Sequence, residues 1–207
     1  MNKSIYTLIL LCFTIGCTNG NNKGKTFFSH FQEGPALDSK NWNCLDIDNE
    51  KICTPSQWKI LPQSKYLYYS SLDSLDKNKY FVILKYNETV SSLNIHKYLA
   101  MTYTALIKDT VEKSTSYTSK KLVFNNKTAY YSEYYTRLDN KPYLTYSMVF
   151  ENNKSLYEFA MKFDSASSIH YQEVFKNILV NYQHNNSPIF STKDEIKDIQ
   201  IIDLSKF

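Results

Sequence analysis

Residues 121–163 read KLVFNNKTAYYSEYYTRLDNKPYLTYSMVFENNKSLYEFAMKF, and this stretch decides the fold. Its runs of aromatic, aliphatic and threonine residues favour β-strands, and the runs are separated by short polar turns rich in Asn and Asp. Loops this short join neighbouring strands that run in opposite directions, so the stretch predicts an antiparallel meander. The expected strands are Lys121–Phe124, Thr128–Leu138, Tyr143–Glu151 and Leu156–Phe163.

Segments with helical periodicity flank the meander. A further strand is expected before it at Tyr80–Tyr86, followed by a helix over residues 92–110. Residues 167–182, after the meander, predict a second helix, because apolar side chains recur at three- and four-residue steps. The tail Lys193–Leu204 fits either a short helix or an added strand. This order predicts an α+β fold in which helices pack on an antiparallel sheet.

Two short segments extend this pattern to a known family. Pro55-Ser56-Gln57-Trp58 precedes the first strand, and Ile178-Leu179-Val180-Asn181-Tyr182 ends the second helix. Over residues 52–184 the chain resembles the PsbP-like fold of photosystem accessory proteins and of bacterial lipoproteins similar to DcrB. Asn125-Asn126 stands where that family usually has a glycine or another small residue. The resemblance implies an accessory or binding role without catalysis, although a fold alone does not determine function.

The first residues have the pattern of an exported bacterial lipoprotein. Lys3 precedes the apolar run Tyr6–Phe13, which is too short to span a membrane and predicts a signal peptide over residues 1–16. The next residues, Thr14-Ile15-Gly16-Cys17, resemble the bacterial lipobox, so we expect a lipid on Cys17. Two alternatives are an ordinary cysteine just past a cleavage site and a retained signal anchor.

The lipoprotein pattern also predicts location and organisation. Residues 17–25 are polar and contain glycine, as in a flexible tether. Neither an Asp nor an acidic run follows Cys17, which favours an outer-membrane anchor facing the periplasm. We then expect an N-terminal extension over residues 26–52, a PsbP-like domain over 53–184 and a C-terminal tail over 185–207.

The remaining cysteines predict a disulfide. Cys12 leaves with the signal peptide and Cys17 takes the lipid, so Cys44 and Cys53 form an even pair in an oxidising compartment. The alternatives are two free thiols or half of a metal site. A metal site would need further close-spaced Cys or His ligands, and none lie nearby in the sequence. We therefore expect a disulfide and no metal.

Sequence motifs for common chemistry are missing. The last of the four glycines is Gly34, so neither a phosphate-binding loop nor a Gly-x-Ser-x-Gly elbow can form beyond it. No His-Glu-x-x-His occurs, and the net charge of +4 is scattered, which argues against a nucleic-acid footprint. We expect no catalytic residue and no cofactor. The four histidines, mostly far apart in sequence, are His30, His96, His170 and His184. We interpret His96 and His170 as solvated surface residues.

The tyrosine-rich strand is the best sequence signal for binding. Side chains alternate along it, so one face carries Tyr131, Glu133, Tyr135 and Arg137. Tyrosine and arginine are favoured at protein interfaces, and we expect this face to be the wetter one. The competing interpretation is ordinary packing between neighbouring strands.

Three functions follow from these observations. The first is a lipid-anchored envelope protein that binds a protein partner as an accessory or assembly factor. The second is an immunity or inhibitor lipoprotein that neutralises a toxic enzyme. The third is an envelope hydrolase, which would require His96 or His170 to meet acidic residues in a pocket.

Overall fold

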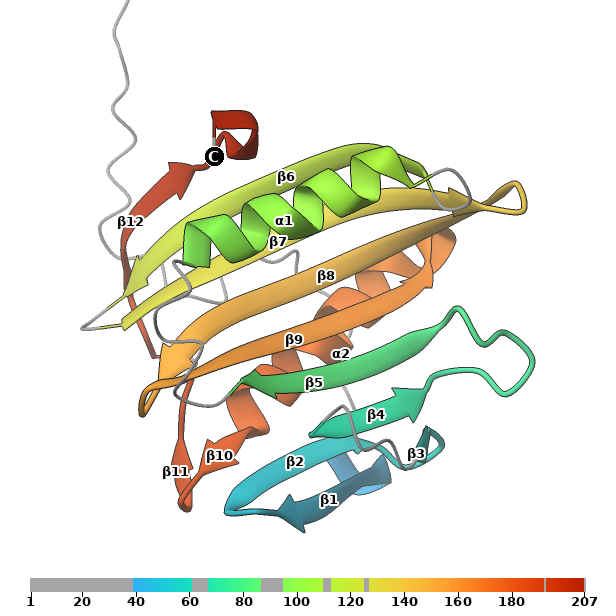
Figure 1. Cartoon of the computed structure of the whole chain (residues 1–207). Coiled ribbons are helices and arrows are strands. Elements are labelled where there is room, and N and C mark those ends of the chain that lie inside the picture. The colour runs from blue at the N-terminus through green and yellow to red at the C-terminus, as the bar shows by residue number, and fades with distance from the viewer. Residues whose placement is uncertain are drawn as a thin grey trace, which may run out of the picture.

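The computed structural model describes residues 39–60, 67–86, 95–109, 113–124, 127–191 and 193–206. The predicted signal peptide, Cys17 and the tether lie outside these residues. An eight-stranded antiparallel sheet dominates the described part of the chain, with a four-stranded sheet beside it (Figure 1). In order across it, the large sheet contains β12 (Ile196–Ile201), β6 (Lys113–Phe124), β7 (Lys127–Leu138), β8 (Lys141–Asn152), β9 (Ser155–Asp164), β5 (Tyr80–Tyr86), β4 (Tyr68–Ser71) and β3 (Lys59–Ile60).

The predicted meander is confirmed by β6, β7, β8 and β9, which pair in sequence order. Two of its turns use residues with positive φ: Asp139 and Asn140 between β7 and β8, then Asn153 and Lys154 between β8 and β9. Three of these four residues are Asn or Asp, which tolerate the left-handed backbone conformation, so the chain can turn there without glycine. Strand β6 begins earlier than predicted, because its polar first half continues the pairing with β7.

The two predicted helices are confirmed and lie on opposite faces of the large sheet. Helix α1 (Ile95–Lys108) crosses in front of β6 and β7, and α2 (Ser168–Asn181) lies behind β8, β9 and β5 (Figure 1). Short 3-10 helices occur at Ser39–Asn41, Ser165–Ser167 and Leu204–Lys206. The α+β architecture is therefore as predicted. None of the described helices is long and apolar enough to cross a membrane.

The small sheet joins the start of the described chain to the segment that follows α2. It has the order β1 (Trp42–Ile47), β2 (Glu50–Pro55), β10 (Gln183–His184) and β11 (Ser187–Pro188). Cys44 lies directly opposite Cys53 in the β1–β2 pair and is bonded to it, which confirms the predicted disulfide. The predicted boundary between residues 52 and 53 falls inside β2, so β1 and β2 are not separate from the domain that follows.

The C-terminal tail contributes a strand to the large sheet. Strand β12 pairs antiparallel with the end of β6, from Ile196 opposite Phe124 to Ile201 opposite Lys120. The choice between a helix and a strand for this tail is thus decided in favour of the strand. Residues 185–207 therefore belong to the folded unit as far as the structure describes them.

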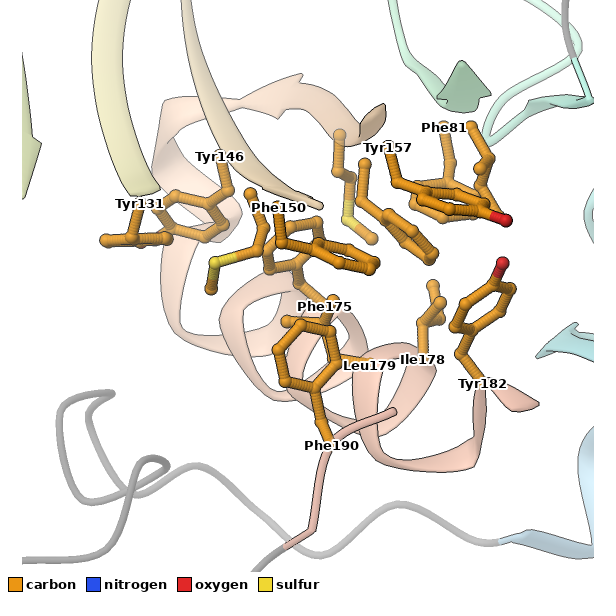
Figure 2. Packing of buried hydrophobic residues seen from close by; sticks show 14 of the residues in the cluster. Phe81, Tyr131, Tyr146, Phe150, Tyr157, Phe175, Ile178, Leu179, Tyr182 and Phe190 are labelled. Carbon is orange, nitrogen blue, oxygen red and sulfur yellow. The ribbon is translucent and has the colours of Figure 1, made fainter. Parts of the chain in front are cut away.

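Most of the apolar core lies between the large sheet and α2. Aromatic rings fill it, and Figure 2 shows Tyr146, Phe150 and Phe175 packed side by side with Leu179. A second, smaller cluster lies under α1, where Leu99 packs with apolar side chains of the opposite sheet face. Helix α2 buries six residues and α1 only two, so α2 makes the larger contribution to the core.

Candidate functional site

The tyrosine face predicted to bind a partner is mostly the face that α2 covers. Tyr131 is only 4 % exposed, and its ring packs against Tyr146 in the main core (Figure 2). The prediction that this ring is available to a partner is therefore wrong. Both faces of β7 carry apolar side chains because both are covered, so alternation along the strand could not identify an open face.

The other three residues of the predicted surface lie nearer the open end of β7. Glu133 is half-buried and accepts a hydrogen bond from the Tyr131 hydroxyl at 2.6 Å. Tyr135 is 40 % exposed, and Arg137 is exposed. The accessible part of this surface is therefore Tyr135 and Arg137, with Glu133 at its margin.

A surface pocket of about 370 Å³ lies between the β1–β2 hairpin of the small sheet and the start of α2. A volume of this size is within the range of sites that hold small ligands or peptide side chains. Both tryptophans of the chain line it. The lining residues are Asn41, Trp42, Pro55, Ser56, Gln57, Trp58, Leu72, His170, Tyr171 and Val174.

One wall of the pocket is a tight turn at Pro55–Trp58. The Trp58 amide donates to the Pro55 carbonyl at 3.1 Å, and the Ser56 amide donates to the Asn41 carbonyl at 2.8 Å. These bonds satisfy backbone groups and leave the Ser56 and Gln57 side chains exposed. The turn is the Pro-Ser-Gln-Trp segment that carried the family resemblance.

Aromatic packing holds the pocket walls in place. Trp58 is buried and its ring centroid lies 6.0 Å from that of Phe81. On the α2 side, Tyr171 stacks on Phe163 at 4.8 Å, and the His170 ring meets it edge-on at 5.1 Å. Burial raises the pKa of the Tyr171 hydroxyl, which keeps this wall neutral.

The pocket lining contains no acidic side chain and no lysine or arginine. Apart from His170, its residues are aromatic, aliphatic, amide, hydroxyl or proline side chains, and none is Asp, Glu, Lys or Arg. The predicted hydrolase needed a histidine and acidic residues in one pocket. His170 lines this pocket without an acidic residue among its neighbours in the lining. Among the described residues no group of three or more His, Cys, Asp or Glu is placed to hold a metal ion.

The other histidines occupy different environments. His96 meets the Tyr130 ring edge-on at 5.3 Å, and His170 is exposed. His184 is not a simple surface residue, because its side chain is only 13 % exposed and Nδ1 lies 2.8 Å from Glu50. His30 lies outside the described residues.

Glu50 is the centre of a buried polar cluster that sequence reasoning missed. Its side chain is fully buried, and Oε1 accepts hydrogen bonds of 2.8 Å from Lys85 and from the Tyr157 hydroxyl. The Tyr182 hydroxyl donates to Oε2, and His184 contacts Oε1. Figure 2 shows the hydroxyl groups of Tyr157 and Tyr182 pointing toward each other at one end of the core. The cluster thus ties β2 and β10 of the small sheet to β5, β9 and the end of α2.

The partners of Glu50 determine its charge. Burial by itself raises the pKa of a carboxyl, but the hydrogen bonds from Lys85, Tyr182, Tyr157 and His184 outweigh it and lower the pKa of Glu50. The same contacts and burial raise the pKa of Tyr157 to about 12 and raise that of Tyr182 further. The cluster is therefore a carboxylate held by a cation and neutral phenols, which is a structural arrangement rather than an acid–base pair.

A second buried carboxyl lies on the opposite face of the sheet. Glu158 accepts hydrogen bonds from the Ser147 hydroxyl at 2.9 Å and from the Tyr98 hydroxyl of α1. Burial raises its pKa, and these two neutral donors only partly offset that effect. Glu158 therefore links α1 to the sheet, and neither of these hydrogen-bond partners is a cation.

Both buried carboxyls left a weak signal in the sequence. Lys85 is the one charge in the apolar run Tyr80–Tyr86, and Glu158 and Lys162 are the two charges in Leu156–Phe163; a charge in such a position requires a buried partner. The partners themselves could not be identified, because Glu50 lies 132 residues from Tyr182 in sequence.

Comparison with known proteins identifies the fold. No family model matches the sequence, and no curated protein matches it. The solution structure of cyanobacterial PsbP (CyanoP) from Synechocystis sp. PCC 6803 is similar, with a TM-score of 0.52 and 9% identity, over 74% of this chain and 97% of that chain. A protein of unknown function from Pseudomonas aeruginosa, described as a putative regulator, superposes with a TM-score of 0.38 and 13% identity, over 66% of this chain and 92% of that chain. The first similarity shows that this chain has a PsbP-like α+β fold.

Proposed function

We propose that the protein is a non-catalytic accessory protein of a bacterial envelope, anchored through a lipid on Cys17, that binds a protein partner through the pocket between Trp42, Trp58 and Tyr171. The pocket is the observation that carries this proposal. Tryptophan and tyrosine dominate the binding energy of protein interfaces because they bury a large area while keeping a polar tip. Here Trp42 and Tyr171 are partly exposed and line one hollow on the surface, and Trp58, which also lines it, is buried.

The composition of the pocket supports binding rather than chemistry. A general acid or base needs a titrating group matched to its task and a second group that orients it. The lining has His170 and Tyr171, and burial moves the Tyr171 pKa upward, away from neutrality. Tyr135 and Arg137 offer a second exposed patch on another part of the sheet, and they are the natural comparison in any test of binding.

Site-specific photo-crosslinking in the cells that make the protein tests the partner. A photoreactive phenylalanine analogue replaces Gln57, which is exposed at the pocket, and in a control replaces Lys154, which is exposed in the β8–β9 turn. We expect a discrete crosslinked protein from position 57 and none from position 154. The crosslink should disappear in Trp42→Ala and persist in Tyr135→Ala.

The opposite pattern would contradict this site. If Tyr135→Ala removed the partner and Trp42→Ala did not, the exposed end of β7 would be the binding surface. If position 57 captured no protein in any background, the pocket would not bind a partner.

The anchor needs an experiment of its own. We expect the wild-type chain to float with membranes and to carry acyl mass on Cys17, and we expect Cys17→Ala to be soluble. Two or more acyl chains hold a protein firmly, whereas a single chain holds it weakly. A wild-type chain that is soluble and unmodified would overturn the lipoprotein part of the proposal and leave the binding part standing.

A further inference from the structure

We infer that the loop between β4 and β5 is a second contact for the same protein partner, and that its tip residue, Leu75, enters an apolar pocket of that partner. This inference rests on the proposed function, because it adds a contact beside the binding site named there. The loop comprises residues 72–79 and projects beyond the end of the sheet (Figure 1).

The Leu75 side chain lies almost entirely in water. It is 94 % exposed, the highest value among the large apolar side chains of the described residues. Leu72, three residues earlier, packs instead against the main core. Removing apolar area from water is favourable, so burial of Leu75 in a partner would contribute to binding. Single exposed apolar residues are common on protein surfaces, and it is the build of the surrounding loop that distinguishes this one.

Hydrogen bonds within the loop fix the backbone that carries Leu75. The Leu72 amide donates to the Lys79 carbonyl at 3.0 Å, which closes the loop at its base. Asp73 Oδ1 accepts a hydrogen bond from the Leu75 amide at 2.9 Å, and Asp73 Oδ2 lies 3.3 Å from Lys79 Nζ. The tip is therefore held from inside the loop, while the Leu75 side chain remains in solvent.

Asp76 attaches the same loop to the large sheet. Its Oδ1 accepts from the Asn78 amide at 3.1 Å, and its Oδ2 accepts from the Tyr143 hydroxyl of β8 at 3.0 Å. A loop that is ordered before binding loses less conformational entropy when a partner docks. The loop thus presents Leu75 in a position that is already set.

The loop begins at the wall of the pocket proposed to bind the partner. Leu72 is a lining residue of that pocket, and three residues of chain from Leu72 to Leu75 span at most about 11 Å. A protein interface of ordinary size buries about 800 Å² on each partner, which corresponds to a patch roughly 16 Å in radius. A protein that occupies the pocket therefore extends over Leu75 as well.

Two other occupants of the loop match it less well. A membrane-docking loop gains affinity for anionic lipids from an excess of Lys and Arg, but here Asp73 and Asp76 balance Lys77 and Lys79. A second copy of this chain would have to offer an apolar pocket, whereas the pocket described above exposes Asn, Ser and Gln side chains. The loop therefore fits a protein partner with an apolar pocket of its own.

Crosslinking from two positions tests the inference. The photoreactive phenylalanine analogue replaces either Gln57 at the pocket or Ser74, which is exposed beside Leu75. We expect mass spectrometry to identify the same protein in both adducts. Leu75→Ser should lower the yield of both by about tenfold or more, because the buried apolar side chain is lost. Leu75→Met, which keeps an apolar side chain, should restore most of the yield. The yields are compared at expression levels where the adduct increases in proportion to the chain.

Two further variants separate the loop from a general effect of exposed apolar side chains. Ile201→Ser removes a side chain that is 79 % exposed on β12, at the other end of the large sheet, and should leave both yields unchanged. Asp73→Ala removes the contacts to the Leu75 amide and to Lys79 while keeping Leu75, and should give a smaller loss than Leu75→Ser. Leu75→Ser and Ile201→Ser should both keep the urea midpoint of the wild type, since each changes an exposed side chain.

Several outcomes would overturn the inference. An undiminished adduct at position 57 in Leu75→Ser would reject the contact through Leu75 and keep the proposed function. Position 74 could instead capture lipid, a second copy of the chain or a protein different from the one at position 57, and each result would assign the loop to that occupant. Equal losses in Ile201→Ser and Leu75→Ser would also reject it. No adduct at position 57 in the wild type would remove the proposed function, and the inference with it.

Discussion

Glu50 of the small sheet and Glu158 of the large sheet are both buried, and their carboxyl groups have different hydrogen-bond partners. Glu50, on the α2 side, meets Lys85 and two phenol hydroxyls, and its pKa is lowered. Glu158, on the α1 side, meets only neutral donors from Ser147 and Tyr98, and its pKa is raised. Burial acts in the same direction on both, so the difference comes from the partners.

The large sheet is thus joined to the elements packed on it by different polar contacts on its two sides. On the α2 side a charged cluster adds to a large aromatic core, and breaking it leaves charges buried without partners. On the α1 side a carboxyl with neutral donors lies under a helix that buries only Leu99 and Ala100. We therefore expect the α2 side to respond strongly to loss of its polar contacts and the α1 side to respond weakly.

The largest effect is expected from Glu50→Gln. This change leaves Lys85 without its buried carboxylate, and breaking a buried ion pair in this way destabilises a protein by about 3–5 kcal/mol. The matched Glu158→Gln keeps an acceptor for Ser147 and Tyr98. Its free energy of unfolding should therefore fall by only about 1 kcal/mol, the contribution of one ordinary hydrogen bond. Urea unfolding measures both. Equal losses would show that the two clusters do not differ as described.

The next effect is expected from the disulfide that closes the hairpin carrying Glu50. The paired substitution Cys44→Ser with Cys53→Ser removes a bridge with a sequence separation of 9. The chain-entropy model assigns about 2–3 kcal/mol to so short a loop. Chemical reduction of the wild-type chain should give the same shift in urea midpoint. If reduction leaves the midpoint unchanged, the paired strands hold the hairpin without the bridge.

A third pair of variants removes one phenol hydroxyl from each cluster. Tyr182→Phe deletes a donor to the Glu50 carboxylate, and hydrogen bonds to charged groups contribute about 1.5–3 kcal/mol. Tyr98→Phe deletes a donor to Glu158, which has no cation among its hydrogen-bond partners, so we expect a smaller loss of about 0.5–1.5 kcal/mol. A larger loss for Tyr98→Phe in the same unfolding assay would mean that Glu158 is the more strongly ionised carboxyl.

The smallest effect is expected from pH. The lowered pKa of Glu50 contributes stability above the ordinary value of 4.5, and this contribution is lost as pH falls through its folded pKa. The raised pKa of Glu158 acts the other way: its contribution is complete below 4.5 and is lost as pH rises through its folded pKa. Comparing each Gln variant with the wild type from acid to neutral pH should give slopes of opposite sign. Slopes of the same sign would contradict the assignment.

The meander was predictable because its turns are local. Asp139-Asn140 and Asn152-Asn153 interrupt apolar runs, and the strands on either side pair with their neighbours in sequence. The Cys44–Cys53 bridge was also predictable, because it joins residues close in sequence in the compartment proposed for the chain. Such features need no knowledge of which distant segments meet.

The features that could not be predicted from the sequence depend on contacts between residues far apart in the chain. The burial of Tyr131 follows from the position of α2, which alternation along β7 does not encode. The pocket brings Trp42 and Trp58 against a helix that begins more than a hundred residues later, and neither tryptophan suggested a site by itself. Strand β6 was predicted too short because its first half, Lys113–Ser119, has few apolar residues.

The small sheet has a consequence for the order in which the protein can fold. Strand β2 pairs with β10, and Lys51 lies opposite Gln183. This pairing can form only after the ribosome has added Gln183, long after Lys51. The β1–β2 hairpin and its disulfide involve only nearby residues, and closing a short loop is fast compared with pairing distant strands. In the envelope location proposed for the chain, the hairpin can therefore be oxidised before β10 has been made. The edge of β2 then remains unpaired until β10 is made, so a chaperone that shields β2 during this interval would protect the newly made protein from pairing with another chain.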